Sequence, residues 1–410
     1  MSDVRSIPFA PARRRRDGRH MPLLIWQIER LARKIECGCI TAVLPNGRRI
    51  VHTGPQPGPH AKLVIRRWRA LWRLMVGGEL AFAESFFDGD WWTPDLLALL
   101  DLGARNERAL QDSITGVVTQ RWISRFKHWA RRNTRRGSKR NIAAHYDLGN
   151  AFYAHWLDRG MNYSSAVFAR SDETLEAAQN RKLDRIVELL DVTGGERVLE
   201  IGCGWGALME RLLPQCDVTG ITLSAEQLAF ARQRVRAGDP GSRADLRLQD
   251  YRDVDGAYDR IVSIEMIEAV GERYWPVYFA KLNQSLTADG VVLLQAITID
   301  EDRAAGYRTQ PDFIQRYIFP GGVLPTVATI RREAANAGLE LVSHELFGQS
   351  YARTLALWRE NFLAQWPAIA PLGFDAAFKR MWEYYLSYCE VGFRSGAIDV
   401  GFYKLVKRAG

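Results

Sequence analysis

The chain has 410 residues, of which 47% are hydrophobic and 25% charged, a length and composition that predict two or three globular domains. No run of 18 apolar residues occurs, so we expect no membrane-spanning helix. The formal net charge is +9. The five cysteines lack a convincing metal-site spacing, so we expect reduced thiols, no metal site and a cytoplasmic setting.

The N-terminal part of the chain predicts a tail followed by a small domain. Residues 1–20 are polar and rich in arginine, with no apolar segment behind the charges, which predicts a disordered basic tail rather than a secretory signal. Residues 21–112 predict a mixed accessory domain. It contains a β-hairpin over 39–52 and a helix over 68–76, which we expect the Gly77-Gly78 pair to end.

Residues 113–140 predict a basic linker. Nine Lys or Arg residues and no acid lie between Ser113 and Tyr146, which equals the formal excess of the whole chain. Trp122, Phe126 and Trp129 share one helical face beside these charges. A basic amphipathic helix with aromatic residues is typical of contact with an anionic membrane surface. A solvated linker whose rings pack on the protein is an equally weighted alternative.

Residues 141–410 alternate between strand and helix patterns, which predicts an α/β domain with a doubly wound, mostly parallel sheet. Strands are expected at 198–201, 218–223, 246–250, 258–265, 290–299 and 338–343. Helices are expected at 174–190, 225–237, 275–286 and 327–337. Ser224 and Gln227 have the spacing of a capping box at the start of the second of these helices.

The most informative stretch is Arg197–Gly206, a buried strand carrying Glu200 that runs into glycines 202, 204 and 206 and then a helix. Without Cβ atoms this turn can take unusual φ/ψ angles and lets a ligand lie against the backbone. The spacing is not that of the dinucleotide fingerprint, and no phosphate-binding Lys-Ser/Thr is nearby. The turn looks like the S-adenosylmethionine (SAM) site of class I methyltransferases.

Further motifs along the chain make the resemblance specific. They are Tyr163-Ser164, 198–206, 220–227, 250–253, 268–271, 316–321, 347–351, 384–389 and 392–394. Together they resemble bacterial cyclopropane-fatty-acyl-phospholipid synthases over about residues 140–408, and residues 21–112 look like the lipid-binding domain of the longer members.

The resemblance implies a reaction and a location. SAM would alkylate the cis double bond of an unsaturated phospholipid acyl chain, and loss of a methyl proton, usually to bound bicarbonate, would close a cyclopropane ring. The partners would be unsaturated phospholipids at the inner face of the cytoplasmic membrane, contacted peripherally, and a homodimer stays open.

The resemblance also assigns site residues. Those for SAM are Tyr163, Ser164, Glu200, Gly202, Gly204, Gly206, Thr222, Leu223, Ser224, Gln227, Asp250 and Tyr251. Segment 222–227 would approach the ribose. Asp250 and Tyr251 would approach the adenine, with a helix cap as the alternative for Asp250. The reacting cation also calls for an aromatic cavity, for which nine rings are available: Tyr146, Phe168, Trp275, Tyr278, Phe313, Tyr317, Phe319, Tyr351 and Trp358.

The base site shows two departures from the family pattern. Glu268 and Tyr351 match the usual bicarbonate ligands, but Ser165 stands for a Cys and Gln295 for a His. Glutamine can donate a hydrogen bond to an anion but cannot carry a proton. Backbone contacts at Ser165 and Ile297 would survive, so bicarbonate would bind more weakly, and Glu265 or Glu268 could replace it as the base. Cys389 falls on a cysteine shared with some members, and we favour a structural role for it.

Cyclopropanation is therefore the first expectation. The alternative is methylation of the acyl chain without ring closure, which gives a methylene or methyl-branched product. A catalytically dead lipid-binding protein is a third option. A nucleic-acid methyltransferase is disfavoured because Ser263-Ile-Glu265-Met stands where an Asp/Asn-Pro-Pro-Tyr/Phe motif is expected.

Overall fold

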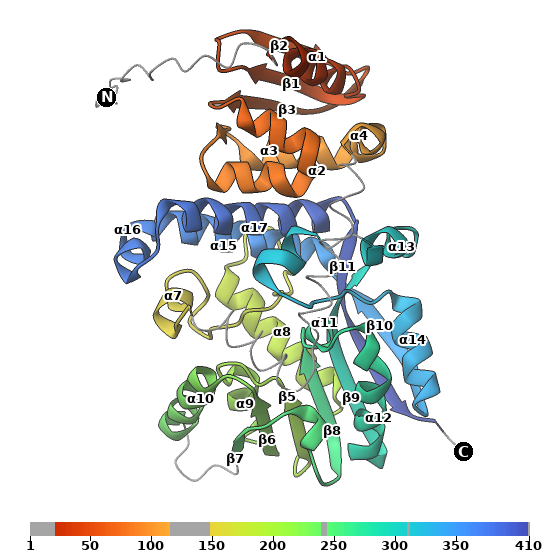
Figure 1. The fold of residues 1–410 in the computed structure, drawn as a ribbon. Coiled ribbons are helices and arrows are strands. Elements are labelled where there is room, and N and C mark those ends of the chain that lie inside the picture. Colours follow the sequence, from red (N-terminus) through yellow and green to blue (C-terminus); the bar gives the residue numbers. More distant parts are fainter. Residues whose placement is uncertain (1–20, 115–147, 239–243, 310–311, 409–410) are drawn as a thin grey trace.

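A computed structural model describes residues 21–114, 148–238, 244–309 and 312–408. The predicted basic tail and most of the predicted basic linker lie outside these ranges. The described chain forms two β-sheets separated by a layer of helices (Figure 1). Within these ranges, no helix is both long and apolar enough to cross a membrane.

The N-terminal part is built on a four-stranded sheet with the order β2-β1-β3-β4. The predicted hairpin is confirmed, because β1 and β2 pair antiparallel, while β3 pairs with β1 in parallel. The elements are α1 (Met21–Ala32), β1 (Cys37–Val43), β2 (Arg49–Thr53), β3 (Gln56–Ile65), α2 (Arg69–Phe87), β4 (Trp91–Trp92), α3 (Leu96–Arg105) and α4 (Glu107–Ile114). The predicted helix end at Gly77-Gly78 is half right: Gly78 leaves the helical region, with φ 64° and ψ −157°, but α2 resumes behind it.

The C-terminal part is a seven-stranded sheet with the order β10-β11-β9-β8-β5-β6-β7. Strands β7, β6, β5, β8 and β9 are parallel, and β11 runs antiparallel between β9 and β10. The strands are β5 (Arg197–Ile201), β6 (Asp217–Thr222), β7 (Ala244–Leu248), β8 (Tyr258–Ile264), β9 (Leu286–Ile299), β10 (Leu339–Leu346) and β11 (Ile398–Lys407). The doubly wound, mostly parallel sheet is confirmed, while β11 was not predicted from the sequence.

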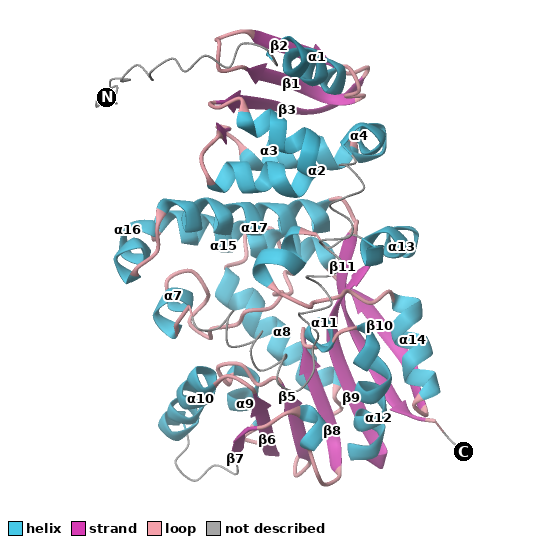
Figure 2. Cartoon of the chain, in the orientation of Figure 1, coloured by secondary structure: helices cyan, strands magenta, loops and turns pink. Residues whose placement is uncertain are grey.

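Helices cover both faces of this sheet because successive strand residues point to opposite sides (Figure 2). Val198 of β5 packs in the cluster with α8 (Leu175–Leu189), α9 (Ala207–Leu212) and α10 (Ala225–Gly238), whereas Leu199 packs with α12 (Trp275–Ser285) and α14 (Val327–Asn336). The remaining short segments are α7 (Asn150–Ala154), η1 (Tyr251–Asp253), α11 (Ile267–Val270), η2 (Glu272–Tyr274), α13 (Glu301–Thr309) and η3 (Ile314–Ile318).

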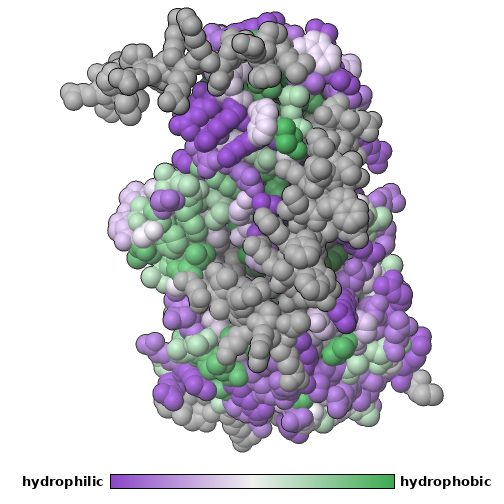
Figure 3. Space-filling model, viewed as in Figure 1, coloured by the Kyte–Doolittle hydropathy of each residue, from purple (hydrophilic) through white to green (hydrophobic). Residues whose placement is uncertain are grey.

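The layer between the sheets is made mainly by α15 (Gly348–Ala364) and α17 (Ala376–Arg394), joined by α16 (Trp366–Ile369) and η4 (Ala370–Leu372). Hydrophobic residues gather on the surface over the α16 end of this layer (Figure 3). Polar contacts join the layer and its surroundings to the N-terminal part. Arg380 donates to the Phe87 carbonyl, Tyr317 and Arg316 both contact Glu84, and Arg303 pairs with Glu107. One continuous apolar core spans both parts.

Candidate active site

The glycine turn lies where β5 ends and α9 begins. Gly202 and Cys203 donate their backbone N–H groups to the Ile221 carbonyl at 2.9 and 3.0 Å, which ties the turn to β6. Gly204 has φ 52°, and a Cβ built on it would meet no atom within 4 Å, so its backbone is bare toward open space. Gly206 instead lies against Ala231 of α10.

That open space belongs to a cavity of about 1160 Å³ that reaches from the glycine turn to the N-terminal part. Several residues predicted to bind the cofactor line it: Tyr163, Gly202, Gly204, Thr222, Leu223, Gln227 and Tyr251. Of the predicted catalytic residues, Glu265, Glu268, Tyr351 and Cys389 line it. The turn and the predicted reaction chemistry therefore open onto the same space.

Five predicted cofactor residues do not line this cavity, namely Ser164, Glu200, Gly206, Ser224 and Asp250. The Asp250 carboxylate caps η1 and accepts hydrogen bonds from the Arg252 guanidinium at 2.7 and 2.6 Å, as the helix-cap alternative expects. Its neighbours Gln249 and Tyr251 face the cavity instead. A role for Asp250 at the adenine stays a prediction.

The predicted capping box at α10 forms in one direction only. Ser224 Oγ accepts the Gln227 N–H at 3.3 Å, but the Gln227 side chain does not return to Ser224. Gln227 Oε1 accepts the Thr222 hydroxyl at 3.0 Å instead. This contact holds the end of β6 against the first turn of α10, beside the cavity.

The predicted base site converges on Glu265, at the end of β8. Its Oε1 accepts the Ser165 N–H at 2.9 Å and Gln295 Nε2 at 2.8 Å, and its Oε2 accepts the Tyr351 hydroxyl at 2.7 Å. Glu265 itself has φ 48°, a left-handed conformation that is uncommon for a residue other than glycine. The backbone holds this carboxylate where three donors meet it.

Glu268, on α11, sits beside this cluster. Its Oε1 accepts the Ile297 N–H at 2.5 Å, and its buried Oε2 has no partner within the described residues. Burial, followed by the nearby negative charge of Glu265, raises the pKa of Glu268 to about 8. Burial also raises the pKa of Glu265, although its three donors and Lys182 oppose the shift. Glu268 therefore holds a proton at neutral pH more readily than an ordinary carboxyl does.

Lys182, which was not predicted as a site residue, is buried behind this site on α8. Its Nζ donates to Ser164 Oγ at 2.9 Å and to Asn162 Oδ1 at 3.4 Å. Burial lowers the pKa of Lys182 to about 8 and raises that of Glu200 to about 8, while attraction between the two groups opposes both shifts. A usable signal exists in the sequence, because Lys182 lies four residues from the buried residues Ala178 and Ile186 on one helical face.

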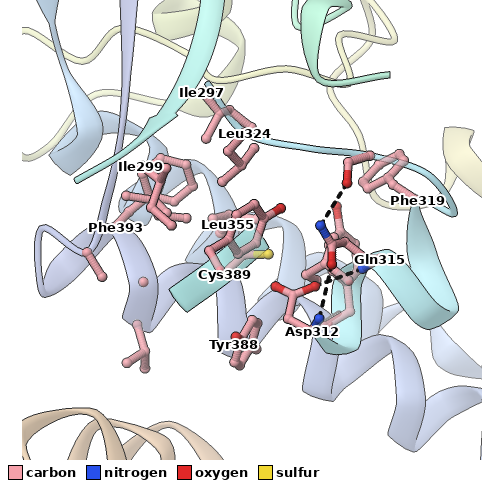
Figure 4. A pocket seen from close by; sticks show the side chains of 18 of the residues that line it. Ile297, Ile299, Asp312, Gln315, Phe319, Leu324, Leu355, Tyr388, Cys389 and Phe393 are labelled. Carbon is pink, nitrogen blue, oxygen red and sulfur yellow. Dashed lines mark hydrogen bonds between the residues drawn. The ribbon is translucent and has the colours of Figure 1, made fainter. Parts of the chain in front are cut away.

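Cys389 lies on the cavity wall made by α17, next to Tyr388, while Asp312, Gln315 and Phe319 come from the segment around η3 (Figure 4). Burial raises the pKa of the Cys389 thiol strongly, so it stays protonated and is a poor nucleophile. No group of three His, Cys, Asp or Glu side chains that could hold a metal occurs among the residues the structure describes.

The aromatic lining differs from the predicted set. Among the nine expected rings, Phe319 and Tyr351 line the cavity, and Tyr146 lies outside the described residues. Trp275 and Tyr278 are buried in the core under α12 instead. The other rings at the cavity come mainly from α17 and the Tyr163 loop: Tyr163, Tyr384, Tyr385, Tyr388 and Phe393. The Tyr163 and Tyr385 hydroxyls are hydrogen-bonded at 2.9 Å.

Sequence comparison identifies the family. The family model described as "Mycolic acid cyclopropane synthetase" matches residues 133–403. The chain belongs to this family. It is 42% identical over 377 residues to tuberculostearic acid methyltransferase UfaA1 of Mycobacterium tuberculosis, covering 87% of this chain and 85% of that protein. It is 35% identical over 334 residues to the cyclopropane-fatty-acyl-phospholipid synthase of Escherichia coli K12, covering 80% and 83%.

Solved structures agree with this placement. The cyclopropane synthase MmaA2 of M. tuberculosis superposes with a TM-score of 0.62 at 33% identity, covering 66% of this chain and 98% of that one. The mycolic acid cyclopropane synthase CmaA1 complexed with SAH and CTAB gives the same values. A coclaurine N-methyltransferase at 18% identity and a TM-score of 0.60 shares the fold. The protein is a SAM-dependent methyltransferase of the cyclopropane synthetase family with a class I methyltransferase fold.

The residues present fit SAM but not bicarbonate. The bare backbone at Gly204 opens onto the cavity beside Gln227 and Tyr251, as a cradle for SAM requires. The two backbone donors expected to hold bicarbonate are already taken, because Ser165 serves Glu265 and Ile297 serves Glu268. A second anion there would also meet two carboxyl groups, so the site does not fit bicarbonate.

Proposed function

We propose that this enzyme methylates the cis double bond of an unsaturated phospholipid acyl chain and forms a methylene branch rather than a ring. The observation that carries the proposal is the Glu265 carboxylate, held by Ser165, Gln295 and Tyr351 in the cavity that contains the glycine turn. These three residues, which were expected at the bicarbonate site, instead bind the carboxylate of Glu265, which can serve as the base. Similarity to a tuberculostearic acid methyltransferase supports the same reading.

SAM bound at the glycine turn supplies an electrophilic methyl group. As the methyl carbon leaves sulfur and bonds to one alkene carbon, the other alkene carbon is left cationic. Loss of a methyl proton at this point closes a cyclopropane ring. A 1,2-hydride shift first gives a more stable tertiary cation, and loss of a methyl proton then gives the methylene group. In both cases the acyl chain gains CH2 and Glu265 takes one proton.

The setting of Glu265 favours the second course. Burial raises the pKa of Glu265, but its three donors stabilise the charged form and make it a weaker base than an equally buried carboxylate without donors would be. Slow proton removal gives the downhill hydride shift time to occur. The Tyr351 hydroxyl stays protonated as a donor, since burial and the charge of Glu265 raise its pKa well above the ordinary value.

Glu268 lies beside this cluster with its pKa raised to about 8, so it is mostly protonated at neutral pH and does not take up the proton that Glu265 receives. Its role in the proposal is to remain neutral beside Glu265, which avoids a second buried negative charge at the site. Cys389 lines the same cavity with a protonated thiol, for which we propose a packing role. Peripheral association with the inner face of the cytoplasmic membrane follows from the proposed phospholipid substrate.

Cyclopropanation remains the second candidate, favoured by the family and by the E. coli relative. Expression in a bacterial host that lacks cyclopropane lipids tests both. Gas chromatography with mass spectrometry should show a fatty acid one CH2 heavier that mild hydrogenation converts to a methyl-branched chain and ozonolysis cleaves to a ketone. A product that survives both treatments would establish the ring and refute the methylene proposal.

A further inference from the structure

Among the residues that the structure describes, no other element buries the outward face of the four-stranded N-terminal sheet, whose side chains are exposed or half-buried. Strand register places its residues in rows, and residues opposite each other in register point to the same face. The rows are Thr53–Cys39–His60, Val51–Thr41–Lys62 and Arg49–Val43–Val64–Trp92. We call these ten residues the outer sheet face. A hydrogen bond from Thr53 to Cys39 at 3.4 Å agrees with their shared side.

The chemistry of the outer sheet face is basic and apolar. Arg49, Lys62 and His60 are exposed, and none of the ten positions carries an acid. Within the described residues, neither Arg49 nor Lys62 forms an ion pair, in contrast to Arg48, which pairs with Glu29. Val51 is 63% exposed and Trp92 42% exposed, although both lie on strands. Such a face has free positive charge and apolar surface together.

The opposite face of the same sheet lines the cavity. Ala42, Leu63 and Trp91 alternate along the strands with outer-face residues, and all three line the cavity that reaches the glycine turn. A surface that contacts the outer face would therefore be one sheet thickness from the cavity. A bilayer in contact with the outer sheet face would therefore lie close to the cavity proposed to take up the acyl chain.

We propose that the outer sheet face docks on an anionic lipid bilayer, a contact additional to that predicted for the basic linker. The bilayer is chosen as the partner because its charge is complementary: the outer sheet face has cations and no acids, and a bilayer surface carries anionic head groups. Val51 and Trp92 suit the interfacial region, where tryptophan is enriched. A second copy of this chain would bring the same cations face to face. The biological purpose of this contact rests on the proposed lipid substrate, but the binding itself does not.

The test is co-sedimentation of the full-length protein with vesicles of phosphatidylglycerol and phosphatidylcholine, and with phosphatidylcholine alone. Each Lys or Arg near an anionic surface contributes roughly fivefold to binding. The double variant Arg49→Glu/Lys62→Glu should therefore bind the anionic vesicles at least about thirtyfold more weakly, with a flatter dependence on salt. The matched control is Arg236→Glu/Arg331→Glu, with the same charge change on exposed residues of α10 and α14.

Three outcomes would overturn the proposal. They are unchanged vesicle binding by the double variant, an equal loss in the control, and conversion of a dimer to a monomer by the double variant in sedimentation velocity. Methyl transfer to the lipid in nonionic mixed micelles should be the same for the variant and the wild-type protein. If the wild-type protein methylates no lipid, the proposed function fails while the binding result still stands.

Discussion

Replacing Glu265 with glutamine removes the proposed base while keeping its shape. General-base catalysis contributes about 10²–10⁴-fold, so kcat should fall by that factor, equivalent to roughly 2.7–5.4 kcal/mol on the barrier. The fold should survive, because burial outweighs the three donors and raises the pKa of Glu265, which means that its charge is costly to bury. A neutral side chain of the same size removes that cost.

The assay is transfer of labelled methyl groups from SAM to unsaturated phospholipid vesicles, with the SAM affinity measured separately by calorimetry. Affinity should stay within about threefold, since Glu265 belongs to the cluster beside the cofactor cradle. The wild-type rate should rise with pH through the raised pKa of Glu265, and the Gln variant should lose this rise. A Glu265→Gln rate within about threefold of wild type would refute the assignment of the base.

Glu265→Gly supplies a complementary measurement. Glycine suits the backbone there, because φ is 48°. The change empties the position faced by Ser165, Gln295 and Tyr351, so millimolar bicarbonate or formate should restore part of the lost rate. Absence of rescue by either anion would show that these donors do not form an anion site.

Four further changes test other parts of the site. Gly204→Val should weaken SAM binding at least about tenfold in calorimetry, whereas Gly47→Val, with a similarly positive φ and open space around it, should cost about the same 1–2 kcal/mol of stability without this effect. Glu268→Gln should reduce the loss of stability between about pH 4.5 and 8 in urea titrations, because the folded wild-type protein keeps a proton there that the unfolded chain releases. Lys182→Met should destabilise the protein by about 3–5 kcal/mol in the same titrations, since it leaves nearby carboxylates uncompensated. Replacing four linker arginines with Gln should weaken binding to anionic vesicles and flatten its salt dependence; they are Arg131, Arg132, Arg135 and Arg136.

The sequence was enough to predict those strands whose apolar pattern matches their burial in the structure. The strand before Gly202 is buried on both faces and reads as a continuous apolar run, so its place in a parallel sheet follows from the sequence. Strand β11 escaped notice for the opposite reason. Its central residues Val400–Tyr403 are buried, but Asp399 and Lys404 interrupt the apolar pattern and its partners are distant in sequence.

In the site, single residues could be predicted from the sequence, but their contacts with one another could not. Motifs identified Glu265, Gln295 and Tyr351 one by one, but no periodicity could show that the latter two donate to the first. That arrangement depends on the left-handed backbone at Glu265 and on three separate elements meeting there. The aromatic set was harder still, because a buried ring such as Tyr278 and a cavity ring such as Tyr384 look alike in sequence.

The place of β11 also has a consequence for biosynthesis. Among the described strands, β10 pairs only with β11, and β11 is synthesised after both β9 and β10. Until then the growing chain exposes open edges on both β9 and β10, which are templates for aberrant pairing with other nascent chains. Variants that lack β11 (Ile398–Lys407) should therefore aggregate rather than yield a smaller working enzyme.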